Sequence, residues 1–197
     1  MNFGFLRETE AMAQKAGKDI STGICRTGLE TYLSLIFPDC KDWIHDKPLG
    51  VVINGKKCMK RPDYRSDSLR LIVEFDGLLH YQKPTSVLAD KQNSILYQSV
   101  GYTVVRIPYF IQLTKTNVER LFGIKCNVEL FPENICSLCV ENENTPAFLC
   151  LEGIRRMARE FHQFPDKYEM EVAHLKDEDE KMTGIQALSY FYQNQNV

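Results

Sequence analysis

Apolar residues recur along this chain at two spacings, and the spacing separates the predicted helices from the predicted strands. The segment 27–38 carries its apolar residues at helical intervals and ends at Pro38. The segment 69–76, LRLIVEFD, is rich in β-branched and apolar residues and is predicted to be a strand closed by a turn at Gly77. The segment 102–108 has the continuous apolar character of a buried strand.

Three further segments complete the predicted core. Helices are expected over 86–101, which ends at a glycine, and over 114–122. The extended stretch 43–55 leads to a turn at Asn54-Gly55, and 56–65 is predicted to return as the second strand of a hairpin. This succession of helix, strand meander, helix and strand predicts an α/β fold.

The character of the sequence changes near residue 125. The stretch 125–149 is rich in cysteine and turn-forming residues, and 150–163 is predicted to be a helix followed by an acidic, partly helical tail. We therefore divide the chain into an N-terminal segment (1–26), a core (27–124) and a cysteine-containing, mainly helical C-terminal extension (125–197).

Composition narrows the cellular setting. Hydrophobic residues make up 44% and charged residues 25% of the 197 residues, which is typical of a globular protein with its own core. No apolar run is long enough for a membrane helix, and the N-terminus lacks a signal-peptide pattern. Seven dispersed cysteines favour a reducing compartment. We expect a cytoplasmic protein without a membrane partner.

The net charge of −2 hides a local excess of positive charge. Six basic residues and two acids lie between Lys56 and Arg70. Such a basic stretch favours a polyanionic partner, because lysine and arginine bind phosphates, although a solvated surface gives the same pattern. The candidates for nucleic-acid contact that precede Asp63 directly are Lys56, Lys57, Lys60 and Arg61.

Acidic residues gather where two of the predicted strands meet. Side chains alternate along a strand, so Glu74 and Asp76 share one face, and a hairpin connection would bring Asp63 alongside Glu74. Acids on an apolar strand are costly to bury unless they hold a cation or accept hydrogen bonds. Carboxylates from adjacent strands suit Mg²⁺, which keeps several waters and can assist phosphodiester hydrolysis. The alternative is an ion pair with Arg61, Arg65 or Arg70.

The order of these residues resembles a known nuclease family. Pro62-Asp63, ten residues, and then Glu74-Phe75-Asp76 is similar to the PD-(D/E)xK motif of the restriction-endonuclease-like superfamily. The continuation through His80-Tyr81, Asp90 and the segment 101–107, GYTVVRI, resembles the very-short-patch-repair endonuclease branch. The resemblance covers roughly residues 27–122. It implies a mixed central β-sheet flanked by helices and a DNA endonuclease dependent on Mg²⁺ or Mn²⁺.

The resemblance also assigns roles to individual residues. The superfamily usually has lysine where this chain has Asp76, and His80 would take over that role, with Lys91 and Lys83 as alternative cations. The alternatives are that Asp76 caps the turn before Gly77 and that His80 is a packed core residue. If no cation reaches the site, the nuclease fold is catalytically inactive. The implied catalytic residues are Asp63, Glu74, Asp76 and His80; the implied metal ligands are Asp63, Glu74, Asp76 and Glu30; Gln82 and Lys91 join the nucleic-acid contacts.

Two other functions remain open from the sequence. A nuclease fold that has lost cleavage would bind nucleic acid or act as a scaffold. Four cysteines of the extension, with His162 as a substitute ligand, would instead build a zinc-stabilised interaction module, although buried free thiols explain them as well. We expect DNA rather than RNA as the partner, and a homodimer would permit cutting of both strands. The four cysteines are Cys126, Cys136, Cys139 and Cys150.

Overall fold

The computed structural model describes residues 29–53 and 55–194. The predicted N-terminal segment 1–26, the first two residues of the predicted helix 27–38 and the turn residue Asn54 lie outside these ranges.

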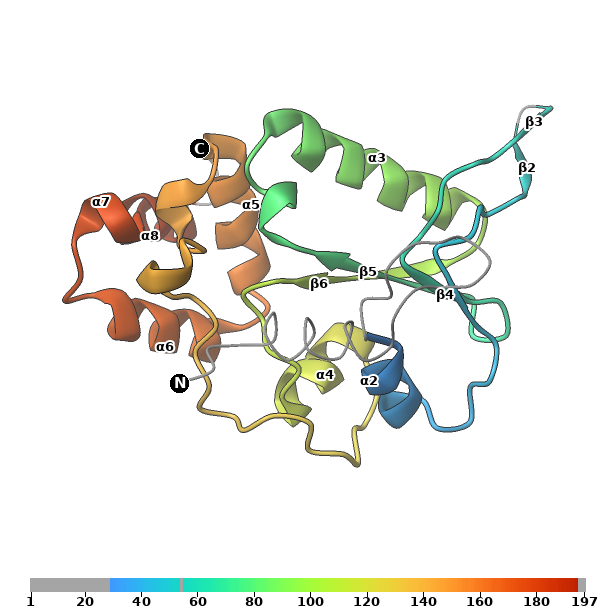
Figure 1. Ribbon diagram of the computed structural model, residues 1–197, viewed down its shortest axis with the longest axis horizontal. Helices are drawn as coiled ribbons and strands as arrows, with labels where there is room; N and C mark the ends of the chain where they lie inside the picture. Colours follow the sequence, from blue (N-terminus) through green and yellow to red (C-terminus); the bar gives the residue numbers. More distant parts are fainter. Residues whose placement is uncertain (1–28, 54, 195–197) are drawn as a thin grey trace.

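A four-stranded mixed sheet forms the centre of the molecule (Figure 1). The strand order is β1-β4-β5-β6, in which β4 pairs antiparallel with both neighbours and β5 pairs parallel with β6. Helices cover both faces, so the predicted α/β class with a mixed sheet is confirmed at that level. The strands are β1 (Trp43–His45), β4 (Tyr64–Ser66), β5 (Leu71–Asp76) and β6 (Thr103–Pro108).

Strand β5 is the central element that the apolar pattern predicted. Five of its six residues are buried, and it lies between β4 and β6. The strand begins at Leu71, two residues later than predicted. Arg70 has φ of 52°, a left-handed conformation that ends the turn over 67–70 and cannot continue into a strand.

The two faces of the sheet carry different helices. Helix α3 (Pro84–Ser99) covers one face, and α2 (Leu29–Ile36) and α4 (Lys115–Phe122) cover the other (Figure 1). Helix α3 begins at Pro84, earlier than the predicted residue 86, because proline fits the first helical position. In α2, the four apolar residues predicted to share a face are all buried: Leu29, Tyr32, Leu33 and Ile36.

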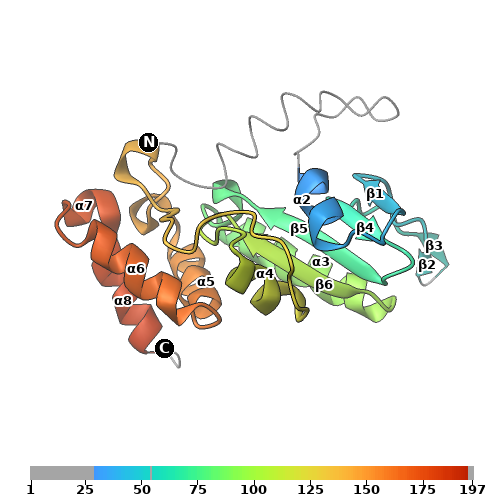
Figure 2. The same cartoon turned by 90° about the horizontal axis from the view of Figure 1, so that it is seen from below.

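The C-terminal extension is helical and lies at one end of the sheet (Figure 2). Short 3-10 turns at Val140–Asn142 and Pro146–Phe148 interrupt the cysteine-rich stretch. A cluster of buried aromatic and aliphatic side chains joins the helices to the segment after β6. The four helices are α5 (Leu151–Phe161), α6 (Pro165–Leu175), α7 (Glu180–Thr183) and α8 (Ile185–Gln193).

Helix α5 docks closely on the chain that follows β5. A 3-10 turn (Leu78–His80) leads to Tyr81, whose carbonyl accepts hydrogen bonds from the backbone N–H and the thiol of Cys150. A Cβ atom on Gly153 would lie 1.9 Å from the same carbonyl oxygen. Only glycine therefore permits this approach of the helix N-terminus to the core.

A two-stranded ribbon projects from the opposite end of the molecule (Figure 1). Its strands are β2 (Val52–Ile53) and β3 (Lys56–Lys57), which pair only with each other. The predicted hairpin is therefore present, and its lower part forms β1 and β4 of the sheet.

None of the helices within 29–53 and 55–194 combines the length and the apolar character that a membrane span needs.

Candidate active site

Asp63 and Glu74 lie side by side on neighbouring strands. The β4–β5 register pairs Tyr64 with Val73, so the preceding and following residues meet at the edge of this ladder. The backbone N–H of Asp63 donates to Glu74 Oε2 at 3.0 Å, and Asp63 Oδ2 accepts from the N–H of Phe75 at 2.8 Å. The hairpin thus places the two carboxylates together, as the sequence predicted.

The surroundings of this pair disfavour two negative charges. Glu74 is buried, and burial together with the neighbouring Asp63 raises the pKa of Glu74 to about 7. Burial also raises the pKa of Asp63, although the hydrogen bond from Phe75 opposes the shift. Within the described part of the chain, neither carboxylate forms an ion pair.

The arginines that might have neutralised the pair are bound elsewhere. Arg61 donates to the carbonyl and carboxylate of Asp46, and Arg65 pairs with Asp67 at 3.2 Å. Arg70 donates to the carbonyls of residues 100 and 101. Tyr97 on α3 is also buried, and burial together with the neighbouring Glu74 raises the pKa of its hydroxyl. The ion-pair alternative for Asp63 and Glu74 therefore finds no partner in these three arginines.

Asp76 is also buried, but it is surrounded by cations. Arg106 on β6 donates to both of its carboxylate oxygens, each at 2.6 Å. Arg156 on α5 donates to Oδ2 of the same carboxylate. Both oxygens of Asp76 are therefore already engaged by guanidinium groups, which compete with metal coordination at this residue.

His80 and Asp90 extend this charged network. His80 Nδ1 lies 2.8 Å from Asp90 Oδ2 and 3.3 Å from Asp76 Oδ1. The hydrogen bond to Asp90 raises the pKa of His80. Burial opposes ionisation of Asp90, but the His80 hydrogen bond and the charge of Arg106 lower its pKa. The contact between the two side chains therefore favours the protonated form of His80 and the ionised form of Asp90.

The C-terminal extension contributes to this network. Besides Asp76, Arg156 donates to Asp90 Oδ2 at 2.8 Å and to Glu160 Oε1 at 2.7 Å. Its guanidinium lies 4.5 Å from the ring centre of Tyr81, whose hydroxyl donates to Glu160 at 2.7 Å. One arginine thus joins α5 to β5 and α3 by charge-assisted hydrogen bonds.

The structure offers a second possible arrangement of metal ligands. Asp76, His80 and Asp90 each present a ligand atom, and these three atoms lie within 4.8 Å of one another. Asp63 and Glu74 do not belong to this group. Since Arg106 and Arg156 fill the space around Asp76 and Asp90, a cation here would have to displace guanidinium groups.

The remaining predicted site residues lie farther from the carboxylate pair or have other contacts. Glu30 on α2, on the other face of the sheet, accepts from the Tyr64 hydroxyl at 3.2 Å. Gln82 is partly buried after the 3-10 turn. Lys83 and Lys91 are exposed, and in the described structure neither forms an ion pair. The cation nearest the motif position is therefore an arginine rather than either lysine.

The cysteines of the extension do not gather into a metal site. Cys126 donates to the carbonyl of Val128, and Cys150 caps α5 by accepting from Gly153. Burial raises the pKa of Cys136 to about 11, which disfavours the thiolate that zinc requires. Across the described ranges, the group of candidate ligands that lie close together contains no cysteine.

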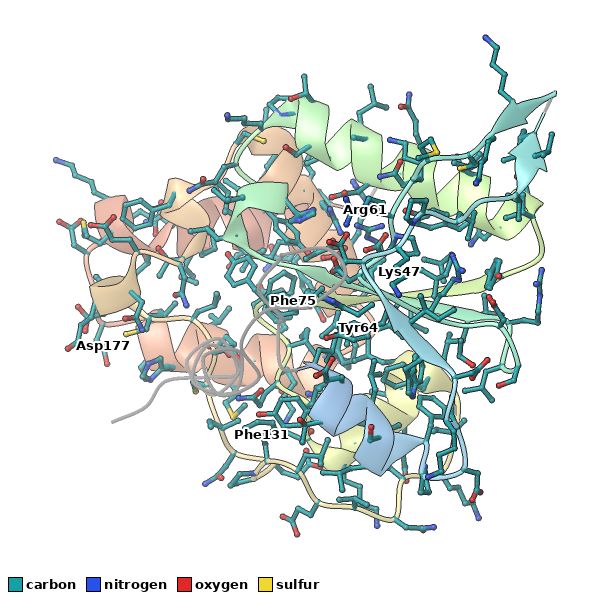
Figure 3. All side chains as sticks on the ribbon, turned by 45° about the vertical axis from the view of Figure 1, so that its right-hand side comes forward. Lys47, Arg61, Tyr64, Phe75, Phe131 and Asp177 are labelled. Atoms are coloured by element: carbon teal, nitrogen blue, oxygen red, sulfur yellow. The ribbon has the colours of Figure 1, made fainter. Side chains whose placement is uncertain are left out.

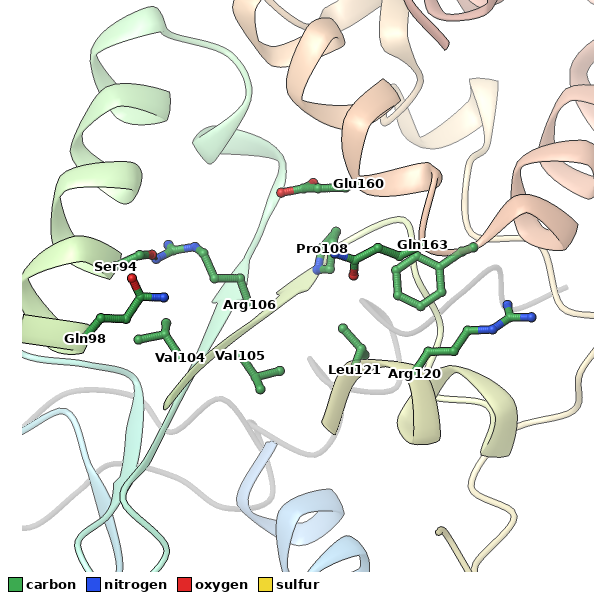
Figure 4. Close-up of a pocket in the computed structure, with 11 residues that line it drawn as sticks. Ser94, Gln98, Val104, Val105, Arg106, Pro108, Arg120, Leu121, Glu160 and Gln163 are labelled. Carbon is green, nitrogen blue, oxygen red and sulfur yellow. The ribbon is translucent and has the colours of Figure 1, made fainter. Parts of the chain in front are cut away.

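A groove lies between α3, β6, α4 and α5 (Figure 4). Its volume is about 590 Å³, and its walls include Ser94 of α3, Arg106 of β6 and Glu160 of α5. An adjoining cavity of about 620 Å³ reaches Lys91 and Arg159. Arg106 lines both spaces, and Asp90 of the charged network borders the second.

Sequence reasoning missed four residues that shape the site. Tyr97 lies seven residues after Asp90 and shares its buried face of α3, a helical spacing that the sequence displays. Arg106 stood within the family-like segment 101–107 without an assigned role. Arg156 and Glu160 come from the extension, and only their place beside the apolar stripe of α5 could have indicated burial.

Comparison with protein-family models, curated proteins and solved structures finds no match to this chain.

Proposed function

We propose that this protein is a metal-dependent endonuclease that hydrolyses phosphodiester bonds of DNA. The observation that carries the proposal is the pair Asp63 and Glu74: two adjacent carboxylates, poorly solvated, without an ion-pair partner among the described residues. Such a pair is unfavourable unless it takes up protons or a cation. Both residues stand at the positions of the PD-(D/E)xK-like motif.

The donor set fits a hard divalent cation. Asp63 and Glu74 supply carboxylate oxygens, and Mg²⁺ or Mn²⁺ binds through one or two carboxylates while keeping waters for substrate exchange. When bound, such an ion supplies polarisation of the phosphate and a water of lowered pKa. The N–H of Asp63 orients Glu74, and the N–H of Phe75 orients Asp63.

His80 is the proposed proton-transfer residue. Its Nδ1 is engaged by Asp90 and Asp76, and the Nε2–H of the protonated ring can donate a proton to the leaving oxygen. Its side chain is 39% exposed, so a phosphate can approach it. Asp76, Arg106 and Arg156 then act by holding this histidine rather than by binding metal.

Cleavage of plasmid DNA with Mg²⁺ or Mn²⁺ tests the proposal. We expect Asp63→Asn or Glu74→Gln to slow cleavage about 1000-fold, because the ion contributes several kcal/mol to the transition state. Glu129→Gln, at an exposed position of the extension, is the matched control and is expected to cut at the wild-type rate. The absence of cleavage on DNA and RNA, together with no Mg²⁺ or Mn²⁺ binding by calorimetry, would contradict the proposal.

A protein that binds nucleic acid without cutting it is the second candidate. It is favoured by the arginines on Asp76, because the motif's usual lysine is missing and its position is occupied by a structural ion pair. In that case the same assays would show DNA binding and no metal-dependent cleavage.

A further inference from the structure

The ribbon that carries β2 and β3 is the distal part of one long hairpin. The register pairs Trp43 with Ser66 at the base and Ile53 with Lys56 near the tip. Between these strands, backbone hydrogen bonds continue from Asp46 to Asp63 and from Leu49 to Lys60. We call residues 47–53 and 55–61 the arm; its second strand runs directly into Asp63 of the proposed metal site.

The base of the arm is anchored and its distal part is free of the core. Leu49 is buried with Ile72 and Tyr97, and Val51 and Cys58 pack against the same cluster. Farther out, β2 and β3 form a separate two-stranded sheet that projects from the molecule (Figure 1). Two large apolar side chains of this part face solvent: Val52 is 71% and Met59 62% exposed. Both side chains are therefore accessible to a partner.

The arm is positively charged along its length. It contains five basic residues and no acid, and Arg61 is paired with Asp46 beside the arm. The four lysines form no ion pair in the described structure. Figure 3 shows Lys47 and Arg61 in the same part of the view as Phe75 and Tyr64 of the sheet. The lysines are Lys47, Lys56, Lys57 and Lys60.

Size and charge point to one form of nucleic acid. The major groove of B-DNA is about 12 Å wide and admits a two-stranded ribbon, whereas the major groove of duplex RNA is too narrow. Lys56 precedes Asp63 by seven residues, which corresponds to about 23 Å of extended strand. That is less than one turn of B-DNA, about 34 Å, so the arm and the metal site reach the same segment of duplex.

We propose that the arm enters the major groove of double-stranded DNA beside the bond held at Asp63 and Glu74. Its lysines contact the phosphates that border the groove, and Val52 and Met59 supply apolar contact with base edges. The substrate class is therefore duplex DNA rather than single strands or RNA. This inference rests on the proposed function for the placement of the scissile phosphate.

Measuring DNA binding in EDTA, which removes divalent metal, tests the contribution of the arm independently of cleavage. The full chain is titrated with a labelled DNA duplex, the single strand and the RNA duplex of the same sequence, at several salt concentrations. A variant with Lys56→Gln, Lys57→Gln and Lys60→Gln is compared with a control that carries Lys115→Gln, Lys125→Gln and Lys176→Gln at exposed sites elsewhere. We expect tightest binding to duplex DNA and a salt slope reduced by two to three in the arm variant alone, about 0.9 for each lost phosphate contact.

Dimethyl sulfate footprinting adds a readout of the groove. It methylates guanine N7, which lies in the major groove, so wild-type protein should protect guanines near the cut and the arm variant should not. Equal binding by both triple variants, equal affinity for RNA duplex, absent DNA binding or unprotected guanines would each overturn the arm proposal. Footprinting by a protein that never cuts would support the arm and contradict only the nuclease; cutting that depends on Glu74 but not on the arm lysines would do the reverse.

Discussion

The site contains two pairs of acidic residues, Asp76 with Asp90 and Asp63 with Glu74, and the two pairs differ in the partners that surround them. Asp76 and Asp90 share two arginines and a histidine, with charge-assisted contacts from three different elements. Asp63 and Glu74 accept hydrogen bonds from backbone N–H groups. The first pair is neutralised by the protein itself, and the second depends on protons or an added cation.

The difference suggests that the pair Asp76 and Asp90 serves the stability of the fold, whereas the pair Asp63 and Glu74 serves the chemistry of the site. A buried ion-pair network is costly to break, because removal of one partner leaves an uncompensated charge. A pair of carboxylates without cations is destabilising in itself, and such strain is typical of sites that bind a ligand. We therefore expect substitutions in the two pairs to act on different measurements.

The largest effect on stability is expected from Arg156→Met. This change leaves Asp76 and Asp90 with one guanidinium fewer, and it should lower the free energy of unfolding by about 3–5 kcal/mol, measured by denaturant titration. Arg159→Met on the same helix changes an exposed side chain and should stay within about 0.5 kcal/mol of wild type. An Arg156→Met protein as stable as this control would show that the network is not structural.

The dependence of the free energy of unfolding on pH should show the titration of the pair Asp63 and Glu74. In metal-free protein the pKa of Glu74 is raised from 4.5 to about 7, so the folded state binds the extra proton in this window. Its contribution to stability is present below pH 4.5 and is lost as pH rises toward 7, with a slope up to about 1.4 kcal/mol per pH unit.

Glu74→Gln should remove this slope and leave the rest of the curve. Glu171, whose pKa burial raises to about 8, titrates in both proteins, so the difference between the two curves reports the coupled pair Glu74 and Asp63. Parallel curves between pH 5 and 7 would mean that Glu74 is ionised in the folded protein throughout.

Added Mg²⁺ or Mn²⁺ should stabilise the folded protein by binding at Asp63 and Glu74. At a concentration of Mg²⁺ or Mn²⁺ ten times its Kd, linkage predicts about 1.4 kcal/mol of stabilisation, seen as a higher Tm at pH 8. Asp63→Asn should abolish the increase, and Arg159→Met should retain it. An increase that survives Asp63→Asn but disappears in Asp90→Asn would move the metal to the Asp76, His80 and Asp90 group.

The smallest effect is expected from His80→Asn. The pKa of His80 is raised by Asp90, so its stabilising contribution is complete below about pH 6.5 and is lost as pH rises through the folded-state pKa. Since the side chain is 39% exposed, the loss should be below about 1 kcal/mol at pH 6 and smaller at pH 9. A loss that grows with pH would show that His80 is neutral when it contacts Asp90.

The carboxylate pair could be predicted from sequence because its determinants are local. Strand alternation fixed the face of Glu74, and the hairpin fixed Asp63 beside it, through residues that are at most 12 apart in the contacts that hold them. The helices over 86–101 and 114–122 were predicted within two residues for the same reason, since caps, proline and glycine act locally.

The neutralised pair could not be predicted, because its partners are distant in the chain. Arg106 lies 30 residues from Asp76 and Arg156 lies 80 residues from it. Their side chains resemble any other arginine in the sequence, and only the parallel pairing of β5 with β6 and the docking of α5 on Tyr81 bring them together. The role of Asp76 was therefore left between a metal ligand and a turn cap.

Helix α5, which docks on Tyr81 through Gly153, is synthesised after the strands that carry the carboxylates, and this sets the order in which the parts of the site form. Ribosomes add about 5–20 residues per second, so about 4–16 s pass between the appearance of Asp76 and that of Arg156, 80 residues later. Asp63 and Glu74 exist throughout that interval, whereas the group that steadies His80 is incomplete. A nascent chain can therefore acquire its acidic pair well before the site is finished, and α5 is the last part of the pocket to be made.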